Sequence, residues 1–122
     1  MAEKLLIVLL NTDPDDPAEL GAPFFQATVA ASMEYAVEIV LTGRVAALGK
    51  RGAAERIQLR EESGRSLYHL IREAHEAGVV LKVSVAGTGL SEKDMIPEVD
   101  EIVGSASVIS EAMREGTVTF TY

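Results

Sequence analysis

Short β-capable runs that alternate with helix-length segments constrain the fold of this chain more than any other feature. The clearest run covers residues 79–85 and is rich in β-branched side chains. The continuous apolar run over 5–10 is typical of a strand that is covered on both faces. Three similar runs cover 37–41, 101–103 and 117–121. Helix-length connections between short strands favour crossovers, so the pattern predicts an α/β fold, a parallel sheet with helices on both faces.

Apolar spacing and capping residues place helices between these runs. The clearest helix carries apolar residues at i, i+3, i+4 and i+7 from Leu67 to Ala74. Ser63 or Ser66 is expected to cap its start, and Gly78 suits the left-handed position past its end. Helices are also expected over 22–34 and 105–114, with shorter helical segments over 44–50, over 53–57 and after Ser91.

Composition narrows the class of protein. A chain of 122 residues with 48% hydrophobic content is expected to form one domain over residues 1–122. Cysteine is absent, which removes disulfides, thiolate ligands and thiol nucleophiles. A formal charge of −8 repels phosphate backbones, so we expect no nucleic-acid partner. The apolar run near the amino terminus is too short for a membrane span or a signal core, and we expect a cytoplasmic protein with no membrane partner.

A candidate site follows from the expected topology. Parallel strands bring the loops after their carboxyl ends to one edge of the sheet, where α/β proteins bind ligands. The candidate ligand-binding residues at this edge are Asn11, Thr12, Gly43, Arg44, Ala86, Gly87, Thr88 and Gly89. Arg44 is the best single candidate for an anion, because a guanidinium binds a carboxylate or phosphate through two donors. A surface charge or an ion pair with a neighbouring acid is the alternative for Arg44.

The turn over residues 86–91 matches no nucleotide motif. Gly87-Thr88-Gly89 lacks the third glycine of a dinucleotide fingerprint, because position 92 is glutamate. The lysine at position 93 precedes an aspartate rather than the serine or threonine of a P-loop. The simpler interpretation is that two glycines adopt positive φ in a tight turn while Ser91 caps a short helix.

We predict no metal site and no cofactor. Asp13, Asp15 and Asp16 could bind a hard cation, but the stretch lacks the spaced acids and the late glutamate of a calcium loop. A solvated turn, with Asp16 capping a helix at Pro17, is the favoured interpretation. The two histidines lie six residues apart on one expected helix and therefore do not form an i, i+4 ligand pair.

The order of the segments along the chain resembles that of a known protein family. A first strand, KLLIVLL, ends in a polar loop, and VEIVLTGRVAALGK supplies a second strand followed by a glycine-containing segment. SLYHLIREAHEAGVVLKVSVAG gives a helix, a glycine, a strand and a small-residue turn, and VDEIVGSASVISEAMREGTVTFTY gives a Gly-Ser-Ala helix and a terminal strand. In this arrangement the chain resembles, over almost its full length, the DsrE/DsrF-like family of sulfur relay and sulfur oxidation.

The resemblance implies a three-layer α/β/α fold with a mainly parallel five-stranded sheet, and assembly into trimers or hexamers. It also implies that active relatives carry a sulfur-bearing cysteine directly after the third strand, a position that Ala86 occupies here. A methyl group cannot hold a sulfane sulfur, so cysteine-based sulfurtransferase chemistry is excluded at this position. Lys93-Asp94 stands where the family often has a basic residue and a glycine.

Two functions of different classes remain. The first is a non-catalytic, DsrE-like homo-oligomeric subunit, accessory to sulfur relay, that contacts a small anion or a sulfur-relay protein around Ala86. The alternative is a cysteine-independent enzyme, or a protein that binds a small anion or nucleotide, at the same edge. Such an enzyme would use hydroxyl groups, Arg44 and the loop acids. We favour the first.

Overall fold

The fold is built around one parallel sheet, seen in a computed structural model that describes residues 3–59 and 64–122. Its strand order is β4-β3-β2-β1-β5, and every neighbouring pair is parallel. The strands are β1 (Lys4–Leu9), β2 (Ala36–Leu41), β3 (Val80–Ser84), β4 (Val99–Val103) and β5 (Thr117–Thr121). The helices are α1 (Pro17–Ser32), α2 (Leu67–Glu76) and α3 (Ser105–Ala112), with 3-10 helices η1 (Gly43–Gly49), η2 (Ala54–Arg56) and η3 (Glu92–Asp94). The predicted α/β fold with a parallel five-stranded sheet is confirmed.

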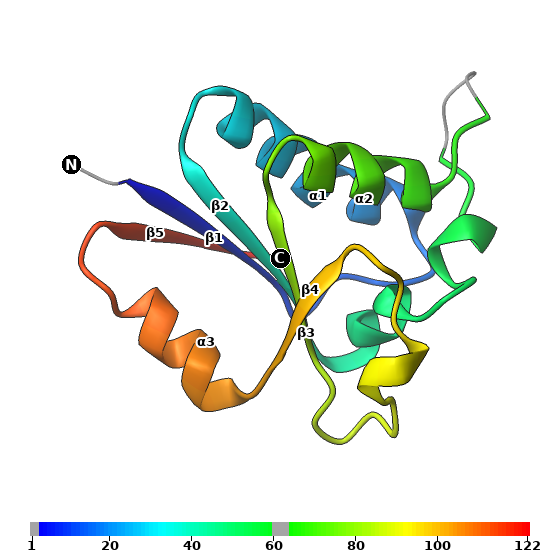
Figure 1. Cartoon of the computed structure of the whole chain (residues 1–122). Helices are drawn as coiled ribbons and strands as arrows, with labels where there is room; N and C mark the ends of the chain where they lie inside the picture. Colours follow the sequence, from blue (N-terminus) through cyan, green and yellow to red (C-terminus); the bar gives the residue numbers. More distant parts are fainter. Residues whose placement is uncertain (1–2, 60–63) are drawn as a thin grey trace.

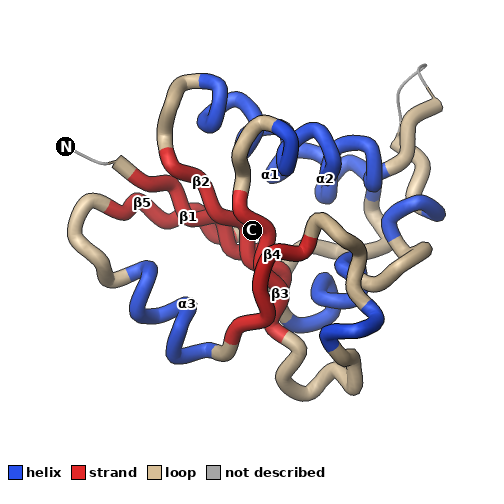
Figure 2. Tube along the Cα trace, viewed as in Figure 1, coloured by secondary structure: helices blue, strands red, loops and turns tan. Residues whose placement is uncertain are grey.

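The strand order explains the three layers. The chain moves outward from β1 through β2 and β3 to β4, with α1 and α2 on one face of the sheet (Figure 1). From β4 it returns across the opposite face through α3 and reaches β5 on the far side of β1 (Figure 2). Right-handed crossovers that run in opposite directions place their helices on opposite faces, so α3 lies alone on the second face.

The two faces of the sheet carry apolar cores of very different size. Alternate residues of the central strands, such as Ile7 in β1 and Ile39 in β2, are fully buried in the large cluster beneath α1 and α2. The smaller cluster beneath α3 consists of Leu6, Val40 and Val103, with partly buried neighbours around it. Strands buried on both faces account for the continuous apolar runs in the sequence.

Helix α1 begins earlier than the sequence pattern indicates. The predicted range was 22–34, but the helix starts at Pro17 with Asp16 as its N-cap, and the Asp16 carboxylate accepts a hydrogen bond from the Ala18 amide. The predicted capping role of Asp16 is therefore confirmed. Pro23 lies inside the helix, against ordinary helix propensity. Burial of Phe24 and its neighbours against the sheet outweighs this local preference.

Helix α2 follows its apolar pattern closely, and Leu67, Leu70, Ile71 and Ala74 are all buried. Ser66 occupies the N-cap position but makes no side-chain cap bond, so its predicted capping role is wrong. Ser63, the other candidate cap, lies outside the described residues. Within the described residues, no helix is long and apolar enough to cross a membrane.

The edge strand β4 is longer than predicted and contains a bulge. It begins at Val99 rather than residue 101, and its register against β3 shifts at Asp100. The Asp100 carboxylate accepts a hydrogen bond from the Leu81 amide at 2.9 Å and contacts the His75 ring at 3.0 Å. The acids around the bulge obscure the alternation on which a sequence-based boundary depends.

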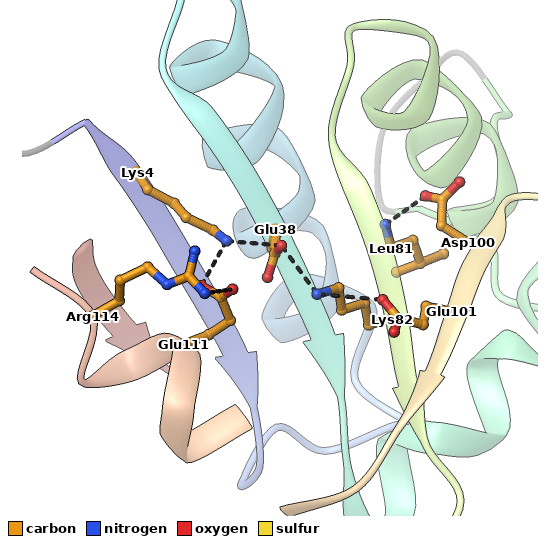
Figure 3. Close-up of polar contacts among 8 residues, drawn as sticks. All are labelled: Lys4, Glu38, Leu81, Lys82, Asp100, Glu101, Glu111 and Arg114. Atoms are coloured by element: carbon orange, nitrogen blue, oxygen red, sulfur yellow. Dashed lines mark hydrogen bonds and ion pairs between the residues drawn. The ribbon is translucent and has the colours of Figure 1, made fainter. Parts of the chain in front are cut away.

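A network of charged side chains crosses the sheet on the α3 face (Figure 3). The ammonium groups of Lys4 and Lys82 both contact Oε1 of Glu38, at 2.8 and 3.0 Å. Lys4 also binds Glu111 of α3 at 2.8 Å, which ties that helix to β1. Glu38 is only 8% exposed, and its second oxygen, Oε2, is buried without a hydrogen-bond partner among the described residues.

Charge pairing in this network shifts two pKa values. Burial lowers the pKa of Lys4, but hydrogen bonds and charge attraction from Glu111 and Glu38 outweigh it, and the net shift is upward from 10.5. The hydrogen bond from Lys4 is the main cause that lowers the pKa of Glu111 below 4.5. Both shifts favour the charged forms. The Lys4–Glu111 pair therefore stabilises the fold between pH 4.5 and pH 10.5, and this contribution is lost as the pH falls below or rises above that range.

Neutralising Glu38 tests the network. Glu38→Gln keeps the shape of the side chain but leaves two partly buried ammonium groups on one neutral amide oxygen, and we expect it to lower the free energy of unfolding by about 3 kcal/mol. The matched control is Glu101→Gln, because Glu101 is more exposed and contacts Lys82 at 3.6 Å. This control should cost no more than about 0.5 kcal/mol. Urea denaturation followed by circular dichroism measures both, and equal losses would contradict the central role of Glu38.

Candidate functional site

The carboxyl ends of β2 and β3 meet at one pocket. The last paired residues, Leu41 and Val83, lie opposite each other, so the loops that follow the two strands leave the sheet side by side. Between these loops lies a pocket of about 430 Å³. Its lining consists of Gly43, Arg44, Ala47, Ala86, Gly87, Thr88 and Leu90. We call this the rim pocket.

The turn beside β3 takes its shape from two glycines and one threonine. Gly87 and Gly89 have φ angles of 74° and 75°, which L side chains rarely adopt. The Thr88 hydroxyl donates to the Val85 carbonyl at 2.6 Å and accepts from the Leu90 amide at 3.1 Å. The predicted positive φ angles are confirmed. The predicted cap at Ser91 is wrong, because Ser91 precedes η3 without a side-chain cap bond.

Ala86 and Arg44 are both exposed and line the same pocket. Ala86 follows the end of β3, and its methyl group stands where the resemblance places the sulfur-bearing cysteine. Arg44 lies in the first turn of η1, after Gly43, whose φ of 57° turns the chain away from β2. Across residues 3–59 and 64–122, the Arg44 guanidinium makes no hydrogen bond or ion pair. Of its two alternative roles, the ion pair is therefore not observed, and a surface charge agrees with the exposure of this side chain.

Three predicted residues do not line the rim pocket. Asn11 and Thr12 follow β1, and Thr12 is buried at 3% exposure. The amides of Leu10 and Asn11 both donate to the Tyr122 carbonyl at 2.8 Å, so Tyr122 closes the gap between β1 and β5. That gap is where the strand order reverses and where ligands commonly bind in this class of sheet. Gly89 shapes the turn but is absent from the lining.

Two lining residues, Ala47 and Leu90, are absent from the sequence-based prediction. Ala47 lies three residues after Arg44, which is one turn of a 3-10 helix, so the two residues share a face of η1. That spacing was readable from the sequence once the segment was identified as 3-10. Leu90 gave no comparable signal, because only the observed turn directs it toward the pocket.

The pocket is suited to binding a small anion, and its described lining contains no group that could act as a base. Among the described residues, Arg44 is the only charged side chain in this lining, which includes no histidine and no acid. The Thr88 hydroxyl is held within its own turn, and Ser84 is 91% buried at the end of β3. Gly87 lines the same pocket, and its amide makes no hydrogen bond within the described residues. A guanidinium beside an unpaired amide can hold an anion through charge-assisted hydrogen bonds.

The other candidate side chains lie elsewhere. Asp13 accepts a hydrogen bond from the Asp15 amide at 2.9 Å, which makes this loop the expected turn. His75 contacts Asp100 at 3.0 Å beside the β4 edge, away from the rim pocket. The Tyr68 hydroxyl binds Glu98 at 2.9 Å. Burial and this hydrogen bond raise the pKa of Tyr68. No group of three or more possible metal ligands occurs in the described part of the chain.

Comparison with known proteins identifies the fold of this chain. No protein-family model matches the chain, and neither does any curated protein. Among solved structures, the ychN protein from E. coli has a TM-score of 0.74 at 15% sequence identity over 100% of both chains. A protein of unknown function from Methanobacterium thermoautotrophicum, MTH1491, has a TM-score of 0.71 at 14% identity over 98% of both chains. The chain therefore has the DsrE/DsrF-like fold that these two structures share.

Proposed function

We propose that this chain is a non-catalytic, DsrE-like subunit that self-assembles into a trimer or hexamer and serves sulfur relay in the cytoplasm as an accessory protein. Its role is to bind, through the rim pocket, a small anion or the anionic group of a sulfur-relay protein. The observation that carries this proposal is the described lining of the pocket, in which Ala86 and Arg44 lie together with no thiol and no base.

The absence of sulfur chemistry follows from Ala86. The resemblance assigns this position to a cysteine that takes up sulfane sulfur, and the structure exposes Ala86 at the end of β3. A thiolate is the group that attacks and holds such a sulfur atom, whereas a methyl group has no electron pair to offer. The chain contains no cysteine elsewhere that could take over this role. The subunit therefore binds what a cysteine-bearing relative or partner processes.

The preference for an anion follows from the charge in the pocket. The chain as a whole carries a formal charge of −8, yet no acidic side chain lines this space and one arginine does. A solitary guanidinium in a shaped pocket attracts oxyanions through both charge and geometry. The same features give the enzyme alternative no support, because Thr88 and Ser84 have no adjacent base to activate them.

Restoring a thiol tests the position of Ala86. After incubation with a persulfide donor, we expect the wild-type chain to take up no sulfur and Ala86→Cys to gain the mass of one sulfur atom. The control is Ser84→Cys, because Ser84 is buried and a thiol there is shielded from the donor. Mass spectrometry without reducing agent measures the uptake. If Ala86→Cys reacts with a thiol reagent but takes up no sulfane sulfur, this edge is not the sulfur position of the fold.

Removing the guanidinium tests anion binding. We expect thiosulfate to bind the wild-type protein and the affinity of Arg44→Ala to fall by about tenfold or more, because a charge-assisted hydrogen bond is lost. The control is Arg51→Ala, which removes an exposed arginine outside the pocket lining. Isothermal titration calorimetry at low ionic strength, with phosphate as competitor, measures both. Equal affinities for the two variants would remove the basis for an anion site.

A further inference from the structure

The two edges of the sheet differ in their ability to accept another strand. At β4 the bulge at Asp100 interrupts the ladder, and Glu98 and Glu101 add negative charge on either side. Bulges and charged side chains are features that keep an edge from pairing with another strand. The opposite edge, β5, has the sequence TVTFT and contains no charge, proline or bulge. Only β5 is therefore suited to extend the sheet.

The outer side of β5 presents unpaired backbone groups. The Tyr122 amide donates to the Val8 carbonyl at 2.8 Å, and the Lys4 amide donates to the Gly116 carbonyl at 3.1 Å. The even-numbered residues of this strand thus point their backbone N–H and C=O groups toward β1. Because successive residues point their backbone groups to opposite sides, Thr119 and Thr121 direct their N–H and C=O groups outward. No strand in the described part of the chain pairs with that side.

An apolar groove of about 500 Å³ lies next to this edge, between α1 and β5. Its exposed side chains are Phe25 (64%), Val29 (43%), Met33 (62%), Tyr35 (45%), Val118 (43%) and Phe120 (43%). With roughly 200 Å² for an aromatic side chain and somewhat less for an aliphatic one, the exposed apolar area is roughly 500 Å². Two such surfaces together reach about 1,000 Å², the lower bound for a specific interface, and the paired β5 strands add further buried area. We call this the β5 groove.

We propose that a second copy of this chain docks here, with the β5 strands of the two copies paired antiparallel around a two-fold axis at Thr119. This inference rests on the self-assembly in the proposed function and specifies its surface. Both N–H···O=C bonds of the central pair then form between Thr119 and Thr119 of the second copy. The sheet becomes continuous across the two subunits.

The register explains why the partner is the same chain. Pairing around Thr119 sets Val118 opposite Phe120 of the second copy, on the face that carries α1. The threonines of both strands then share the opposite face. Because the axis is perpendicular to the sheet, α1 of each copy lies on the same side. The stripe of Phe25, Val29 and Met33 therefore faces its counterpart across the paired strands.

Charge does not oppose this contact locally, although the whole chain is acidic. Within residues 3–59 and 64–122, the ionisable side chains that border the groove are Lys4 and Tyr35, and the Lys4 ammonium is bound to Glu38 and Glu111. An isologous contact uses the same surface on both subunits and produces pairs. Of the two assemblies in the proposed function, the hexamer can contain this two-fold contact between pairs of subunits, whereas a trimer alone cannot.

Thr119→Pro is the sharpest test. It removes an outward N–H and adds a ring at the seam, while every hydrogen bond between β5 and β1 remains. We expect the dimer dissociation constant to rise at least about tenfold, with an unchanged circular dichroism spectrum. Thr119→Val, which keeps the N–H, should assemble like the wild type. Size-exclusion chromatography with light scattering and native mass spectrometry measure the subunit number.

A second variant reports on the groove independently of the strand. Phe25→Lys places two like charges across the axis and should halve the subunit number, as Thr119→Pro does. Wild-type assembly that neither variant reduces overturns the β5 contact and leaves the proposed self-assembly intact. A wild-type monomer overturns both, whereas a groove filled by a co-purifying peptide or apolar molecule overturns the β5 contact alone. Thiosulfate binding in each variant reports on the rim pocket separately, since Arg44 does not border the groove.

Discussion

The parallel register between β2 and β3 is the constraint on which the candidate site depends. Leu41 lies opposite Val83, so both strands end at the same level and release their loops into one space. A slip of one residue would turn every side chain of a strand to the other face, and the buried residues on both sides of β2 prevent it. Arg44 and Ala86, which are 42 positions apart in the sequence, become neighbours for this reason.

Ion pairs attach α3 to its face of the sheet, whereas apolar packing attaches α1 and α2 to the other face. α3 has only eight residues and buries a small apolar cluster, so it supplies little hydrophobic stabilisation. Lys4 and Glu111 compensate by linking β1 to the helix, and Glu38 joins that pair to Lys82 in β3. Such a network contributes modest net stability but requires one arrangement of its partners, which fixes the position of α3 over the sheet.

Local pattern predicted most of the fold. The buried stripe of α2 from Leu67 and the β-branched run of β3 were readable, because burial on one face leaves a period in the sequence. The pattern indicated a capped start at Asp16 and Pro17 but not a continuous first turn, because Pro23 argues against a helix that runs through it and only tertiary packing outweighs that preference. The Lys4–Glu38–Lys82 contacts were also hidden, since they join strands whose order the sequence does not state.

The sequence predicted the candidate site only in part. Loops after parallel strands were expected to gather at one edge, and those that follow β2 and β3 do. Asn11 and Thr12 satisfy the same rule but do not line the rim pocket. The terminal Tyr122 occupies the gap beside them, and nothing in the local pattern reveals this. The exposed Phe25 was equally hidden, because it adjoins the buried Phe24 in a helix with a weak apolar face.

The bulge at Asp100 has a consequence for the behaviour of this chain at high concentration. A sheet with two receptive borders could add neighbours without limit and polymerise into fibrils. Here the interruption at Asp100 terminates growth on one flank. Any association along the remaining flank uses up the last free ladder, so such growth stops after one addition. The bulge and the acidic residues of β4 therefore oppose edge-to-edge polymerisation.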